Sequence, residues 1–167
     1  WFDYMVNDKM SMGYAENEGD FLNPDDWVAI CKDDEPALLN FTNPEVKKIG
    51  DKYLAYGDPS VDFYSINDDR IQPKGTDPLE RGWMTRQLVG AQSTDGIEWT
   101  VTGYIPPDSD HPASHVPAMY IEDDHLFLYY ATQIGYTKSG GDVSKYDEKY
   151  DALRVKRRCV NEITWRV

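Results

Sequence analysis

The sequence is poor in cysteine, in long apolar runs and in positive charge, and each shortage excludes a class of protein. Its 167 residues include only Cys31 and Cys159, which lie far apart and lack the spacing of zinc ligands. Neither a disulfide scaffold nor a zinc site is therefore expected, and the two thiols are either free or a single long-range pair. No apolar run approaches the length of a transmembrane helix. The sequence also lacks a nucleophile-elbow motif and a glycine-rich loop that would cradle phosphate.

Basic residues are outnumbered, because 17 Lys and Arg stand against 30 Asp and Glu, for a formal net charge of −13. A surface this acidic repels phosphate backbones and anionic lipid headgroups. We therefore expect neither a nucleic-acid partner nor a membrane partner. The sequence leaves the compartment open, secretion and a periplasmic location included.

The composition and the residue pattern of the sequence favour short β-strands. Hydrophobic residues make up 40% and charged residues 28%, which is typical of a globular protein, and the aromatic share of 13% suits β-strands and sugar sites alike. No apolar period of 3.6 residues is sustained, so little helix is expected. Strands are predicted at residues 1–6, 10–15, 27–31, 41–49, 52–57, 83–93, 97–105, 115–121, 125–134, 152–158 and 163–167. The polar connection 58–82 is longer than an ordinary connector, and such loops are often functional.

The strands follow a repeated order. When Pro44 is placed on Pro117, Tyr56 falls on Tyr129 without a gap. Repeats of four short antiparallel strands indicate β-propeller blades, which stack because no blade can bury both faces alone. We predict an all-β chain with a partial blade at 1–37, a full blade at 38–110 and most of a third at 111–167. A β-sandwich is the competing fold, but it gives no reason for the repeat.

The residues at both ends of the sequence have the apolar pattern of strands. We therefore expect an incomplete propeller, with about half of the usual number of blades. The terminal blades of such a chain would have open strand edges. Open edges invite association with another chain.

Three stretches resemble the five-bladed β-propeller glycoside hydrolases of family 43 and its relatives, families 32 and 117. They are NPEVKKIGDKYLAYGDPS, AQSTDGIEWTVTGYI and SHVPAMYIEDDHLFLYYATQ. The resemblance implies hydrolysis of a poly- or oligosaccharide at the mouth of the central channel. It also implies a pKa-tuning Asp before a Pro, where this sequence has Asn43, and an acidic Glu two residues before a Pro, where it has His115. The family's base would lie on a strand before Trp1.

Both positions depart from the family 43 pattern, yet a histidine can donate a proton near neutral pH. Family 117 resembles this arrangement in its proposed histidine acid, so His115 is the first catalytic candidate. Glu45 is the second, since a carboxyl group in a closed channel can have a raised pKa. The alternative is a structural role for both residues. His115 would be a polar residue at the start of a strand that forms a hydrogen bond, and Glu45 would be a solvated strand residue.

Further residues are candidates for binding sugar. Asn43 could hydrogen-bond a hydroxyl group, Trp83 could stack on a ring, and arginines could grip hydroxyl pairs. The predicted substrate-binding residues are Asn43, Asp58, Arg81, Trp83 and Arg86. Alternatively, Trp83 packs in the core of a blade, and the Asp and Arg residues are solvated charges in loops. No cofactor or metal is predicted, although a central calcium is compatible with the resemblance. The alternative function is a non-catalytic propeller module that binds carbohydrate or protein.

Overall fold

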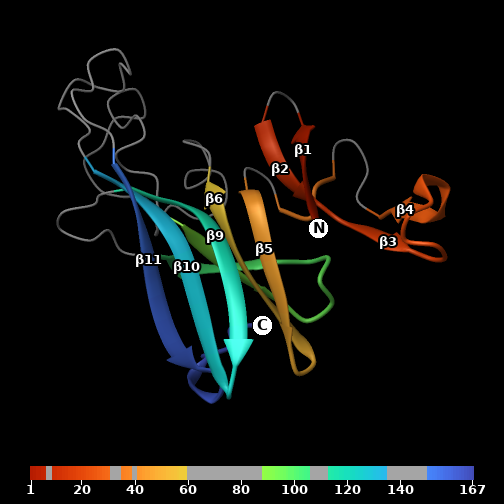
Figure 1. Ribbon diagram of the computed structural model, residues 1–167. Helices are drawn as coiled ribbons and strands as arrows, with labels where there is room; N and C mark the ends of the chain where they lie inside the picture. The colour runs from red at the N-terminus through yellow and green to blue at the C-terminus, as the bar shows by residue number, and fades with distance from the viewer. Residues whose placement is uncertain (7–8, 31–34, 39–40, 60–87, 106–112, 135–149) are drawn as a thin grey trace, which may run out of the picture.

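The computed structural model describes residues 1–6, 9–30, 35–38, 41–59, 88–105, 113–134 and 150–167 (Figure 1). Its strands are β1 Phe2–Val6, β2 Lys9–Gly13, β3 Ala15–Asn17, β4 Trp27–Ala29, β5 Phe41–Ile49, β6 Lys52–Pro59, β7 Val89–Ser93, β8 Thr100–Tyr104, β9 Ala113–Glu122, β10 His125–Ile134 and β11 Tyr150–Cys159. Two short 3₁₀ turns, Pro24–Asp26 and Val160–Glu162, complete the described elements. Within these ranges no helix is long and apolar enough to cross a membrane.

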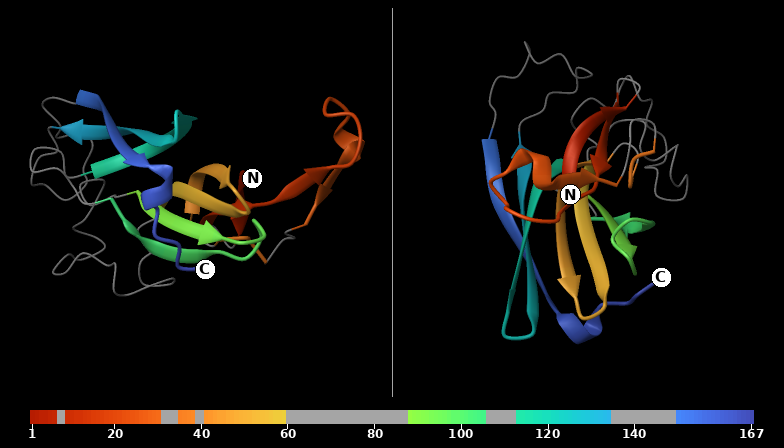
Figure 2. Two further views of the ribbon diagram at one scale, coloured as in Figure 1. Left: turned by 90° about the horizontal axis from the view of Figure 1, so that it is seen from below. Right: turned by 90° about the vertical axis from the view of Figure 1, so that its right-hand side faces the viewer.

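The strands form antiparallel sheets between neighbours in the sequence. The largest sheet has the order β5-β6-β7-β8, the next has the order β11-β10-β9, and β1-β2 and β3-β4 are hairpins. Figure 2 shows the β9–β11 sheet lying beside the β5–β8 sheet, while the β3-β4 hairpin projects away from both. The all-β prediction is confirmed. The number of blades, the blade boundaries and association through open edges stay predictions.

The β5–β8 sheet is buried on both faces because successive side chains of β6 point to opposite sides. Ala55 belongs to a cluster with Met12 of β2 and Phe41 of β5. Its neighbour Leu54 belongs to a second cluster, with Met119 of β9, on the other face. The central sheet therefore packs against the N-terminal hairpin on one side and against the β9–β11 sheet on the other.

The turn between β7 and β8 is wider than the three residues, 94–96, that the predicted strands 83–93 and 97–105 leave between them. Gln92 pairs with Thr100, so β8 begins three residues later than expected. The Asp95 carboxylate accepts the N–H groups of Ile97, at 2.8 Å, and of Glu98, at 2.9 Å, which holds these residues in the turn. These bonds, with that from Ile97 the largest cause, lower the pKa of Asp95. Asp95 therefore has a structural role in this turn.

The predicted strand at 163–167 is wrong for this structure, because the segment has no strand partner among the described residues. Instead the Gln92 side chain bonds to its backbone. Gln92 Nε2 donates to the Thr164 carbonyl at 3.0 Å, and Gln92 Oε1 accepts the Arg166 N–H at 2.8 Å. One amide thus supplies the donor and acceptor that a neighbouring strand would offer.

Candidate functional site

Strands β5 and β9 begin with the same kink, and both begin at the upper end of their sheets in Figure 1. Asn43 and Val116 have positive φ angles of 48° and 50°, and each precedes a proline. The pairing register of both strands shifts at these residues. A bulge of this kind re-aims a strand near its start. The two kinks confirm that Pro44 and Pro117 occupy equivalent places.

Val116 is a strained choice for a positive φ, because β-branched residues are outliers there. We expect Val116→Gly to raise the free energy of unfolding by about 0.5–1 kcal/mol, since relief of the strain exceeds the entropic cost of glycine. Its side chain is 54% exposed, so little packing is lost. Asn43→Gly is the matched control at the equivalent kink, where loss of a side-chain hydrogen bond should lower stability by about 1 kcal/mol. Urea unfolding measures both, and a destabilised Val116→Gly variant would contradict the strain.

A carboxylate from the preceding sheet caps the backbone N–H of each kink. The Asn43 N–H donates to the two oxygens of Asp3 at 2.9 and 3.1 Å. The Val116 N–H donates to Asp58 Oδ1 at 2.8 Å. Strands β5 and β9 are edge strands of their sheets, so without these carboxylates both N–H groups would lack a protein acceptor.

Asp3 was missed by the sequence analysis, although a signal for it existed. Asp3 pairs with Met12 in the first hairpin, and Asp58 directly follows Gly57, the partner of Val89. When residues 12–17, MGYAEN, are laid over residues 88–93, LVGAQS, Met12 matches Leu88, and Asp3 then falls on Asp58. The capping carboxylate is a repeated feature of the sheets.

Asn43 joins the two carboxylates. Its Nδ2 donates to Asp58 Oδ2 at 2.8 Å, while its backbone N–H holds Asp3. Asp58 is only 1% exposed, and both of its oxygens accept hydrogen bonds. Asp58 therefore lies in the structure as a buried link between β5 and β9, whereas Asn43 and Asp3 are exposed at the same edge.

The carboxyl group of Asp3 has a raised pKa. Partial desolvation raises the pKa of its carboxyl group above the usual value, and the hydrogen bond from the Asn43 backbone opposes that rise only in part. A carboxyl group with a raised pKa keeps its proton to higher pH than an ordinary aspartate does. Among the described residues at this edge, Asp3 is the exposed carboxyl group with such a shift.

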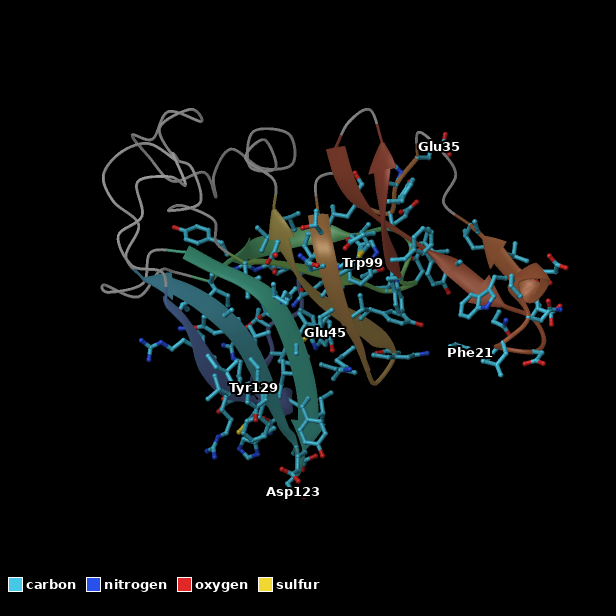
Figure 3. The ribbon with its side chains drawn as sticks, turned by 45° about the horizontal axis from the view of Figure 1, so that its top comes forward. Phe21, Glu35, Glu45, Trp99, Asp123 and Tyr129 are labelled. Atoms are coloured by element: carbon cyan, nitrogen blue, oxygen red, sulfur yellow. The ribbon has the colours of Figure 1, made fainter. Side chains whose placement is uncertain are left out.

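Glu45 lies between β5 and β9 in Figure 3 and connects them. Its Oε1 accepts the Met119 N–H at 3.1 Å and forms an ion pair with Lys47 Nζ at 2.9 Å. The side chain is 28% exposed. Glu45 is thus occupied by partners on its own strand and on the neighbouring sheet, which is a structural arrangement.

The other predicted residues are placed only in part. The backbone of His115 lies in β9 opposite Ala131, one residue before the kink at Val116. Arg81, Trp83 and Arg86 lie outside the described residues. Within the described ranges no group of three or more His, Cys, Asp or Glu residues could hold a metal ion.

A concave pocket of about 580 Å³ lies between the central sheet and the β9–β11 sheet. Leu54 and Tyr56 of β6 line one wall, and Leu126 and Leu128 of β10 line another. Burial raises the pKa of Tyr56, against the opposing effect of the Arg158 charge. None of the predicted sugar-site residues lines this pocket, so it is separate from the edge at Asn43.

Comparisons with known proteins were made for the sequence and for the structure. No protein-family model and no curated protein matches the sequence. Among solved structures, the chain is similar to an endo-arabinanase of glycoside hydrolase family 43 from Bacillus licheniformis, with a TM-score of 0.39 and 17% identity over 72% of this chain. It is also similar to a family 117 glycoside hydrolase produced by the marine bacterium Zobellia galactanivorans, with a TM-score of 0.45 and 15% identity over 87% of this chain. The chain spans 36% and 40% of the lengths of these two proteins.

Proposed function

We propose that this chain is a carbohydrate-active module of the β-propeller glycoside hydrolase type, and that its sugar site is the edge where β5 and β9 begin. The observation that carries the proposal is the convergence there of an exposed Asp3, an exposed Asn43 and the strand start that holds His115. Carboxylates and amides hydrogen-bond the hydroxyl pairs of a sugar ring. The sequence resemblance of these strands adds the expectation of hydrolysis.

Glycoside hydrolysis needs a proton donor for the leaving oxygen and a base or nucleophile on the other face of the sugar. In this proposal His115 is the general acid. Asp3 is the second group that can move a proton, because its exposed carboxyl group lies at the same edge. Asn43 holds the sugar and keeps Asp3 in place through its backbone N–H. Glu45 and Asp58 support the edge from within the structure.

A binding module without hydrolysis is the second candidate. The resemblance implies a carboxyl group at positions 43 and 115, but the sequence has Asn43 and His115, which carry none. This absence favours a binding module. The carboxylate of Glu45, the nearby alternative, already has two partners.

The two candidates are separated by assaying His115→Ala on arabino-, xylo-, fructo- and agaro-oligosaccharides. For an enzyme, we expect loss of a general acid to lower kcat by about 10²-fold or more. His125→Ala is the matched control. His125 begins β10, whereas Ala131, the partner of His115, lies toward the other end of that strand, so the activity of the His125→Ala variant should be unchanged. Unchanged hydrolysis by His115→Ala would remove His115 from the mechanism.

Asp3→Asn tests the edge independently of the histidine. It should weaken sugar binding, measured by calorimetry, for an enzyme and for a binding module alike. A wild-type protein that binds a sugar without hydrolysing it would support the second candidate. A protein that neither binds nor hydrolyses any of these sugars would contradict both.

A further inference from the structure

Cys159 and His125 form a pair at the far end of the β9–β11 sheet from the proposed sugar site. The two residues are direct partners in the register of β10 and β11. Cys159 Sγ lies 3.3 Å from His125 Nε2, within hydrogen-bond reach for sulfur. A nucleophile beside a base is the arrangement that activates thiols and hydroxyls for reaction.

The backbone fixes which ring nitrogen of His125 carries a proton. His125 Nδ1 lies 2.8 Å from the carbonyl oxygen of Asp123, and a carbonyl can only accept a hydrogen bond. Nδ1 is therefore the protonated nitrogen, an assignment made from the hydrogen-bond partners. Nε2 then faces Sγ with a lone pair, ready to accept the thiol proton. A third group orients the base, as nucleophilic sites require.

The turn that supplies this carbonyl is tied to the residue after Cys159. Asp123 and Asp124 have positive φ angles of 47° and 61°, which form the tight hairpin between β9 and β10. Figure 3 shows Asp123 at the tip of that hairpin. The Asp124 carbonyl accepts the Val160 N–H at 2.8 Å, directly after Cys159. The hairpin, the histidine and the cysteine are thus linked in one short network.

Charged residues lie close to both members of the pair in the sheet. Strand alternation places Arg157 on the same face of β11 as Cys159. Glu122 is the partner of His125 in the register of β9 and β10. Cys159 and His125 are half-buried, so a small reagent can reach the sulfur while the pair stays ordered.

We propose that Cys159 is a reactive thiol, activated by His125, and a site of modification by low-molecular-weight disulfides. The thiol proton passes from Sγ to Nε2, and Sγ attacks one sulfur of the disulfide. The disulfide's S–S bond breaks, a mixed disulfide forms on Cys159, and the departing thiolate takes the proton from His125. The reaction needs no other oxidant, because the small disulfide is the oxidant. The proposal is independent of the sugar site.

The test measures the rate at which Cys159 exchanges with 2-hydroxyethyl disulfide. This reagent is uncharged, so the nearby arginines do not attract it. A Cys31→Ser background leaves one thiol, and mass spectrometry follows the mixed disulfide at pH 7. We expect the native protein to react about tenfold faster than the same protein with His125→Gln, since an unactivated thiol is only a few per cent ionised at this pH.

Two further measurements keep the result interpretable. Circular dichroism must show that the His125→Gln variant is folded and unfolds on heating. The same thiol in urea gives the rate of an unstructured cysteine, and the native rate should exceed it. Equal rates for the native protein and folded His125→Gln, or a native rate below that in urea, would overturn the proposal. If His125→Gln does not fold, the comparison with urea decides alone.

Discussion

Replacing Asp58 with asparagine is expected to lower the free energy of unfolding by about 2 kcal/mol, although the two side chains have the same shape. Asp58 Oδ1 accepts the Val116 N–H, and Oδ2 accepts from Asn43 Nδ2. An amide has one oxygen and one NH₂ group, so it can keep both contacts only if the Asn43 side chain also turns over to offer its oxygen. Both hydrogen bonds then lose the strength that a charged acceptor gives them, and because Asp58 is only 1% exposed, water cannot easily compensate.

The exchange of both residues provides the control for this prediction. In the double variant Asp58→Asn with Asn43→Asp, the new amide can donate to the new carboxylate and still accept the Val116 N–H. Aspartate tolerates the positive φ at position 43 nearly as well as asparagine does. We expect the double variant to recover at least half of the lost stability in urea unfolding. Additive losses would show that the Asn43–Asp58 bond does not form.

The second large effect is expected for Phe41→Ala, which should lower the free energy of unfolding by about 3–5 kcal/mol. Phe41 is 0% exposed and lies in the cluster between the first hairpin and the central sheet. A Cβ added at Gly57 would lie within 3 Å of its ring, so the ring packs directly on the β6 backbone and its removal leaves a cavity. Neighbouring side chains on these strands cannot collapse far enough to fill it.

Phe21→Ala is the matched control, since it removes the same atoms from a residue that is 70% exposed. Its ring packs on Trp27, at a centroid distance of 5.3 Å, so a loss below about 1 kcal/mol is expected. Chemical denaturation measures both variants. Equal losses for Phe41→Ala and Phe21→Ala would contradict the assignment of Phe41 to the core.

The sugar site stays a prediction, and the structure shows where several of its residues lie. The repeat led to the starts of the two strands after residues 40 and 112, and there the structure places the kinks, Asn43 and the His115 backbone. Asp58 and Glu45, two of the predicted site residues, accept hydrogen bonds from backbone N–H groups of β9. Sequence alone cannot separate these roles, because a carboxylate that caps an edge strand and one that faces a ligand look the same in a strand pattern.

What the sequence determined was the local structure. Alternating apolar residues set the strands, turn residues set the hairpins, and the spacing of Pro44 and Pro117 set the repeat, because each depends on neighbours along the chain. The tertiary structure decided everything that joins one sheet to another. Asp3 reaches Asn43 across 40 residues, Asp58 reaches Val116 across 58, and Gln92 reaches the C-terminal segment across more than 70. Those contacts depend on how the sheets pack, and no local pattern encodes that packing.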